Sequence, residues 1–201
     1  MEHIFLNGKK DNPVLVMFHG TGGNERSLLD IAKEIDPESP ILGIRGSVKE
    51  SGMNRFFRRL SEGVFDEDDI KFRTNETYDF IKSASIKYNF DLENMVAIGY
   101  SNGANIIASM LYIKGGIFKG AILHHPMVPL KNFKTKDLSK VEIFIGAGRN
   151  DSITPMIEAK KLKNELEYSN ANVTINWEDN GHQLTISEVL AAKEWYIKHL
   201  K

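Results

Sequence analysis

The sequence has no cysteine among its 201 residues. This absence excludes a disulfide framework, a thiolate metal site and a cysteine nucleophile. An excess of one charge is also missing, because 26 lysines and arginines face 27 aspartates and glutamates. No global field therefore favours nucleic acid or an anionic membrane as a partner.

Long apolar runs are missing as well. The longest stretches, such as Val14–Phe18, are far too short to cross a bilayer. The first residues, Met1-Glu2-His3, lead into a short apolar run that does not have the pattern of a signal peptide. We therefore expect a cytoplasmic protein without stable membrane insertion.

What the sequence does contain is a series of short β-rich runs that alternate with segments of helical period. The central runs are continuously apolar, which is typical of a parallel sheet covered by helices on both faces. The expected strands are Ile4–Leu6, Val14–Phe18, Pro40–Ile44, Met95–Ile98, Gly120–Leu123, Val141–Ile145 and Val173–Trp177. The expected helices are Glu25–Ile35, Arg73–Tyr88, Asn102–Tyr112, Pro155–Glu167 and Ile186–His199. This alternation predicts a doubly wound α/β sheet.

One domain over residues 1–201 accommodates all of these elements, because no internal repeat or low-complexity tract divides the chain. The least regular stretch, residues 46–69, lies between a strand and a helix. A connection of that length is usually functional, and we expect it to form an active-site loop or lid.

A candidate nucleophile follows the strand Met95–Ile98. The pentapeptide Gly99-Tyr100-Ser101-Asn102-Gly103 matches G-x-S-x-G and precedes a helix, which is the context that this motif requires. The glycines remove the Cβ atoms that would clash in a tight strand-to-helix turn. By itself the pentapeptide is a weak signal, because a helix-capping serine after a glycine turn would look alike.

A candidate oxyanion hole follows the strand Val14–Phe18, which runs into His19-Gly20-Thr21-Gly22-Gly23. Hydrolases with a G-x-S-x-G serine take one backbone N–H donor of the oxyanion hole from such a turn and the other from the residue directly after the nucleophile. We therefore predict the N–H groups of Thr21 and Asn102 as the donors. A phosphate-binding loop is disfavoured, because the turn lacks both the G-x-G-x-x-G spacing and a Lys-Ser/Thr ending. We expect His19 to be a structural, hydrogen-bonded residue.

A serine nucleophile of this motif works with a carboxylic acid and a histidine base. Both should follow the serine along the chain, first the Asp or Glu and then the His. Asp151 comes shortly after the strand Val141–Ile145, and His182 follows the strand Val173–Trp177. Both therefore lie at the sheet edge that carries Ser101. A carboxylate in this position orients the imidazole and stabilises the imidazolium that forms when the histidine takes the serine proton. Asp179 is an alternative acid, although it is only three residues from His182 and fits a local turn better.

His124 and His125 follow the strand Gly120–Leu123, which comes too early in the chain to supply the base. Adjacent side chains tend to point different ways, so we predict no metal ion shared between them. One of the pair is expected to be buried and hydrogen-bonded. The other, assigned to His125, is expected to line the leaving-group side of the pocket.

The loop of residues 46–69 carries candidate substrate contacts. One hypothesis is that its apolar side chains line an acyl or aryl pocket, while an arginine contacts a carboxylate or polar head of the substrate. The pocket residues assigned in this loop are Met53, Arg55, Phe56 and Phe57. The alternative is that Arg58 and Arg59 pair with the acidic run Asp66-Glu67-Asp68-Asp69 and hold the loop in place.

Taken together, the motifs at Gly20, Ser101, Asp151 and His182 resemble the bacterial phospholipase/carboxylesterase family, the compact α/β-hydrolases that include acyl-protein thioesterases. Residues 52–57 and 63–66 are similar to its MhqD-like subgroup, which is linked to quinone stress. The resemblance covers essentially the whole chain. It implies an α/β-hydrolase fold without a large cap domain. It also implies hydrolysis of carboxylic esters or thioesters through an acyl-enzyme, with no cofactor. Where this chain has His124-His125-Pro126, thioesterases of the family have small residues, so their lipidated-protein substrates do not carry over.

We therefore predict a serine hydrolase acting on esters, and on thioesters by the same chemistry, with small or medium acyl or aryl groups. A small-molecule ester is the expected partner, and a homodimer is compatible with the family. Two alternatives stay open from the sequence: a non-catalytic small-molecule receptor on this fold, and a hydrolase of amide or carbon–carbon bonds.

Overall fold

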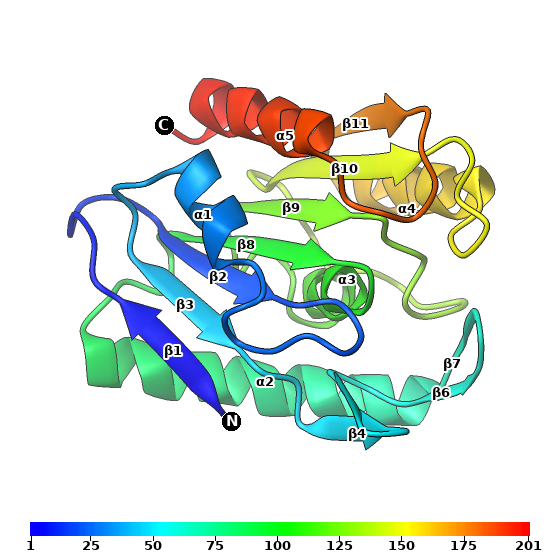
Figure 1. Cartoon of the computed structure of the whole chain (residues 1–201), viewed down its shortest axis with the longest axis horizontal. Helices are drawn as coiled ribbons and strands as arrows, with labels where there is room; N and C mark the ends of the chain where they lie inside the picture. Colours follow the sequence, from blue (N-terminus) through cyan, green and yellow to red (C-terminus); the bar gives the residue numbers. More distant parts are fainter.

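A seven-stranded sheet forms the centre of the computed structural model, which describes all 201 residues. The strand order is β1-β3-β2-β8-β9-β10-β11 (Figure 1). β1 pairs antiparallel with β3 and all other pairs are parallel. The bounds are β1 His3–Leu6, β2 Val14–Phe18, β3 Ile41–Ile44, β8 Met95–Tyr100, β9 Gly120–His124, β10 Glu142–Gly148 and β11 Asn172–Glu178. The predicted α/β-hydrolase architecture is confirmed.

Helices cover both faces of this sheet (Figure 1). On one face α1 (Leu29–Ile35) packs against α5 (Ile186–His199). On the other face lie α2 (Glu67–Tyr88), α3 (Asn102–Lys114) and α4 (Met156–Tyr168). No helix has both the length and the apolar composition that a bilayer crossing demands.

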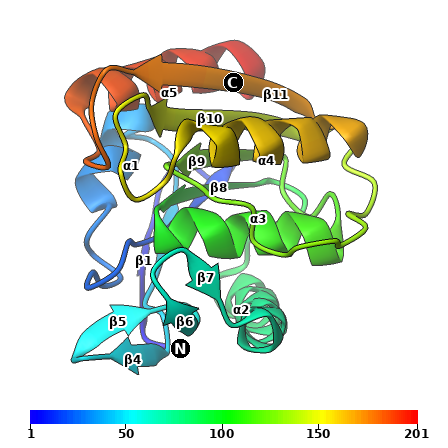
Figure 2. The ribbon, with the colours of Figure 1, turned by 90° about the vertical axis from the view of Figure 1, so that its right-hand side faces the viewer.

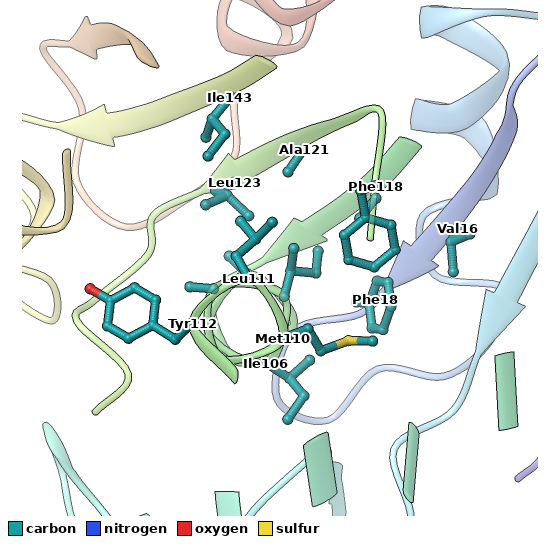
Figure 3. Packing of buried hydrophobic residues seen from close by; sticks show 14 of the residues in the cluster. Val16, Phe18, Ile106, Met110, Leu111, Tyr112, Phe118, Ala121, Leu123 and Ile143 are labelled. Atoms are coloured by element: carbon teal, nitrogen blue, oxygen red, sulfur yellow. The ribbon is translucent and has the colours of Figure 1, made fainter. Parts of the chain in front are cut away.

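The continuous apolar strands divide their side chains between two cores. In β2, Val16 and Phe18 belong to a cluster of 34 buried residues beneath α3, whereas Leu15 and Met17 belong to a cluster of 14 beneath α1 and α5. Figure 3 shows Phe18 next to the α3 side chain of Met110. Because successive strand residues point to opposite faces, a strand buried on both sides needs apolar residues at every position.

Two helices begin elsewhere than predicted. α1 begins at Leu29 and not at Glu25, because Asn24 accepts a hydrogen bond from the N–H of Arg26 and holds the preceding residues in a turn. α2 begins at Glu67, six residues before the predicted start at Arg73. Its cap is Asp66, whose side chain accepts from the N–H of Asp69. The acidic run therefore lies at the positive end of the helix dipole, and not in the loop.

The segment of residues 46–69 is more regular than predicted. It contains two small hairpins, β4 (Val48–Glu50) with β5 (Met53–Arg55), and β6 (Arg59–Ser61) with β7 (Val64–Phe65). Phe56 and Phe57, between the hairpins, are fully buried members of the larger core cluster. Figure 2 looks onto the edge of the sheet where this segment lies. The two phenylalanines thus anchor the segment to the body of the protein.

Candidate active site

Ser101 occupies a tight turn between β8 and α3. Its backbone has φ 52° and ψ -113°, an uncommon conformation for a residue other than glycine. The glycines on either side are required by close packing. A Cβ atom on Gly103 would lie 1.9 Å from the carbonyl oxygen of Phe18, and one on Gly99 would lie 2.7 Å from the backbone nitrogen of Ala104. The motif is therefore structural as well as chemical: glycine allows the serine to project from the sheet edge.

The three residues predicted as a triad lie in contact, with His182 between Ser101 and Asp151. The Nε2 atom of His182 lies 2.9 Å from Oγ of Ser101, and its Nδ1 atom lies 2.7 Å from Oδ2 of Asp151. A carboxylate accepts only, so Nδ1 carries the proton and the Nε2 lone pair faces the serine hydroxyl. The His182 side chain keeps 16% of its surface exposed, whereas that of Asp151 is fully buried.

Asp151 is held ionised by the loop around it. Its Oδ1 atom accepts hydrogen bonds of 2.8 Å from the N–H groups of Ile153 and Thr154. Burial by itself would raise the pKa of Asp151, but the donors from Thr154, His182 and Ile153 outweigh burial and lower it. An ionised Asp151 can stabilise a positive charge on His182, which is the role of the acid in such an arrangement. Asp179, the alternative acid, is paired instead with Arg149 at 3.0 Å.

The predicted oxyanion donors both face the site. Thr21 and Asn102 line the same pocket as Ser101. The N–H of Thr21 has no partner among the main-chain hydrogen bonds of the loops. The N–H of Asn102, at the first position of α3, is one of those that a helix leaves without an intrahelical partner. Both groups are therefore available to a substrate oxygen.

The loop segment braces both of these residues, a feature that sequence reasoning missed. Nη1 of Arg55 donates to Oγ1 of Thr21 at 2.7 Å, and the N–H of Phe56 donates to Oδ1 of Asn102 at 2.7 Å. Nε of Arg55 also donates to the carbonyl oxygen of Phe57 at 3.2 Å. Arg55 and Phe56, which are adjacent in the chain, thus fix Thr21 and Asn102, the two residues expected to hold the oxyanion.

Arg55→Met should lower kcat roughly 10–100-fold, somewhat less than the cost typical of deleting an oxyanion donor outright, because Thr21 would lose its brace but keep its N–H. Steady-state kinetics on a neutral ester measure this. Arg58→Met is the matched control, because Arg58 pairs with Asp66 and Asp69 outside the pocket. Equal losses in the two variants would contradict the bracing role.

His19 and Tyr100 support the site from behind. The N–H of Gly46 donates to Nε2 of His19, so Nδ1 carries the proton and donates to the carbonyl oxygen of Gly20 at 2.6 Å. The predicted structural role of His19 is confirmed. The hydroxyl of Tyr100 donates to the carbonyl oxygen of His182 at 2.7 Å and so ties the histidine loop to β8.

A pocket of about 220 Å³ opens at Ser101. Its wall includes Thr21, Arg55, Arg59, Tyr100, Met127 and His182. Of the predicted pocket residues only Arg55 belongs to it. The prediction was wrong for Phe56 and Phe57, which face the core, because a strand end can turn either face inward and composition does not show which. Met53 is 40% exposed and lies beside Gly22, outside the pocket wall.

The alternative role of the neighbouring arginines is confirmed in part. Arg58 pairs with the acidic run through Asp66 and Asp69, at 3.1 and 3.6 Å. Arg59 instead pairs with Glu50 at 2.8 Å, from which Arg55 lies 3.3 Å away. One carboxylate therefore faces two guanidinium groups next to the pocket.

His125 was also placed wrongly in the pocket. Its side chain is fully buried behind Asp151, where Nδ1 lies 2.9 Å from Oδ2 of Asp151 and Nε2 lies 3.0 Å from Oε2 of Glu188. Glu188, from α5, also binds Nδ1 of His124 through Oε1. Sequence reasoning missed Glu188 entirely.

Only one group of side chains has the spacing of a metal site. The ligand atoms of His125, Asp151 and His182 lie within 4.8 Å of one another. A cation held there would compete with the proton that His182 donates to Asp151, and so would disturb the contact that orients the imidazole. The hydrogen bonds of this group describe a proton network better than a metal centre.

The mostly parallel sheet, the serine at a strand-to-helix turn and the histidine loop beyond the last strand are those of an α/β-hydrolase. The chain belongs to the dienelactone hydrolase family, whose sequence profile matches residues 49–189. It is 50% identical over 196 residues, 98% of both chains, to "Putative hydrolase MhqD" of Bacillus subtilis (strain 168). The resemblance to the MhqD-like subgroup is thereby confirmed.

Solved structures agree with this assignment. The chain is similar to a carboxylesterase of Bacillus cereus, with a TM-score of 0.98 and 53% identity over 100% of this chain and 95% of that one. It is also similar to YahD, whose structure was solved with malic acid, with a TM-score of 0.94 and 35% identity over 98% of both chains. The protein is an esterase-type hydrolase.

Proposed function

We propose that the protein is a serine hydrolase that cleaves carboxylic esters with small or medium acyl or aryl groups through an acyl-serine intermediate. The observation that carries this proposal is the hydrogen-bonded series Ser101–His182–Asp151, which opens into a pocket of about 220 Å³. A pocket of this size fits a short acyl or aryl group better than a long lipid chain.

In the first half-reaction, Oγ of Ser101 attacks the ester carbonyl while Nε2 of His182 takes its proton. The oxyanion lies against the N–H groups of Thr21 and Asn102. His182 then gives the proton to the leaving alkoxide as the carbon–oxygen bond breaks. In the second half-reaction, water attacks the acyl-serine with His182 as base, and the acid leaves. A thioester follows the same steps with a thiolate as leaving group.

Two other functions fit the same residues. A non-catalytic receptor would use the pocket without the proton transfer, and a hydrolase of amide or carbon–carbon bonds would use the same triad. The position of His182 favours a catalytic function over ligand binding alone, because a receptor does not need an imidazole lone pair 2.9 Å from a serine hydroxyl.

Labelling by a fluorophosphonate probe tests the proposal. The wild-type protein should be labelled on Ser101, and Ser101→Ala should not be labelled. A series of p-nitrophenyl esters then ranks acyl length, with acetate and butyrate expected to exceed laurate in kcat/KM. Absence of Ser101-dependent labelling would overturn the serine mechanism, and labelling without ester turnover would favour the alternatives.

We further propose that the preferred substrate carries a carboxylate. Arg55 and Arg59 both line the pocket and share the single carboxylate of Glu50. Glu62 also lines the pocket but forms no ion pair with either arginine. The relative YahD, whose structure was solved with the dicarboxylic malic acid, supports this direction.

Arg59→Met should raise KM for mono-p-nitrophenyl succinate roughly tenfold or more, since a hydrogen bond to a charged group contributes about 1.5–3 kcal/mol. The KM for p-nitrophenyl butyrate, which is similar in length but neutral, should stay within about twofold. Competition by free dicarboxylic acids gives an independent measurement. Equal changes in KM for the two esters would contradict a carboxylate contact at Arg59.

A further inference from the structure

His125 lies in a constrained position directly behind the triad. It follows the last residue of β9 and has φ 53°, a left-handed conformation that is costly for a residue with a side chain. Its N–H donates to the carbonyl oxygen of Gly146 at 2.7 Å, which holds this conformation. Because the side chain is fully buried, His125 cannot touch a substrate.

Both ring nitrogens of His125 face carboxylate oxygens. Nδ1 lies 2.9 Å from Asp151 and Nε2 lies 3.0 Å from Glu188. A neutral imidazole has one N–H, whereas an imidazolium has two. With an ionised carboxylate at each end, only the imidazolium makes both hydrogen bonds.

The buried charges around His125 agree with this state. Burial by itself would lower the pKa of His125, but the contacts with Glu188 and Asp151 outweigh burial and raise it. Burial would likewise raise the pKa of Glu188, but the hydrogen bonds from His124 and His125 lower it to about 2. Two carboxylates thus enclose one ring, and a proton on the ring offsets their charge.

We propose that His125 is a positioning residue, kept as an imidazolium, that holds the Asp151 carboxylate for His182 and offsets part of its negative charge. This inference rests on the proposed serine mechanism. Oδ2 of Asp151 is shared by Nδ1 of His182 and Nδ1 of His125, while backbone N–H groups occupy Oδ1. The carboxylate is therefore fixed from both sides.

The functional consequence is electrostatic. The rings of His125 and His182 lie 5.2 Å apart, which is close enough for a charge on one ring to act on the other. Besides Asp151 and His182, the titratable groups facing His125 are Tyr100 on β8 and Glu188 on α5, and Glu188 also binds His124 on β9.

His125→Asn separates charge from position. Asparagine tolerates positive φ, and its amide nitrogen can take the place of Nδ1 and keep the donor to Asp151. We expect the midpoint of the acid limb of kcat/KM against pH to rise by about one unit or more, since loss of a nearby positive charge favours protonation of the base. The plateau at high pH should change less than about tenfold, because the hydrogen bond that positions Asp151 is kept.

His199→Asn is the matched control, since His199 also contacts a carboxylate, that of Glu142 at 3.2 Å, but lies at the end of α5 away from the site. Its acid limb should match that of the wild type. An unchanged limb in His125→Asn would overturn the proposal. So would an equal shift in His199→Asn.

A second measurement does not depend on that variant folding or on turnover. Nitrogen-15 NMR of the Ser101→Ala protein should show both ring nitrogens of His125 protonated at pH 7. A His125 ring with one unprotonated nitrogen at pH 7 would overturn the proposal whatever the kinetics. If Ser101 proves not to be the nucleophile, the acid limb loses its meaning but the NMR result still reports the charge of His125.

Discussion

Asp151→Asn is expected to lower kcat about 10⁴-fold, the loss typical of triads whose acid becomes an amide. An amide nitrogen facing Nδ1 of His182 would favour the tautomer with the proton on Nε2, which leaves no lone pair for Ser101. The variant also removes one of the two carboxylates that bind His125. Steady-state kinetics on p-nitrophenyl butyrate, with circular dichroism to verify folding, provide the measurement.

Asp179→Asn is the matched control for this variant. Asp179 lies three residues from His182, but its carboxylate is mostly exposed and paired with Arg149. Activity should therefore stay within about twofold of the wild type, as for most exposed surface substitutions. A loss of less than tenfold in Asp151→Asn, or a large loss in Asp179→Asn, would show that another carboxylate orients the base.

The sheet could be predicted from the sequence because its strands are buried on both faces. All seven predicted strands are present, and most of their bounds agree within one or two residues. The helix starts were less predictable. The acidic run Asp66–Asp69 looks like a polar loop, whereas Asp66 caps α2 and the other acids stabilise its positive end. Capping depends on a local hydrogen bond that hydrophobic periodicity does not reveal.

The meeting of Ser101, Asp151 and His182 was predictable for a related reason: in a parallel sheet, residues that follow strands collect at one edge. The surroundings of the triad were not. The contacts from Arg55 to Thr21 and from Phe56 to Asn102 join residues 34 and 46 positions apart through a hairpin that periodicity does not predict. Apart from Arg55, the pocket residues assigned by composition were therefore misplaced.

Glu188 did leave a signal in the sequence. It lies on the buried stripe of α5 with Ala192, Trp195 and Tyr196, where a charged residue is rare unless it is paired. A second signal is Gly146 in β10: a Cβ atom there would lie 2.1 Å from Oε1 of Glu188. An acid on an apolar helix stripe opposite a strand glycine thus indicates a buried partner, here His124 and His125.

Glu188→Ala is expected to cost roughly 3–5 kcal/mol of unfolding free energy at pH 7, because removing one partner of a buried ion pair leaves the other uncompensated. His125 would lose the acceptor at Nε2, and His124 would lose the acceptor at Nδ1. Urea denaturation, followed by tryptophan fluorescence, measures the loss. Glu194→Gln is the matched control, since Glu194 lies on the exposed side of the same helix.

The loss should depend on pH in a defined direction. In the folded protein the pKa of Glu188 is lowered to about 2 from its ordinary value of 4.5. A lowered pKa contributes stability that is fully present above 4.5 and is lost as the pH falls toward 2. The difference between wild type and Glu188→Ala should therefore narrow as the pH falls from about 5 to about 2, a window set by these two values. A difference that stays constant over this range would mean that Glu188 stabilises the fold by packing, and not as the counter-ion of His125.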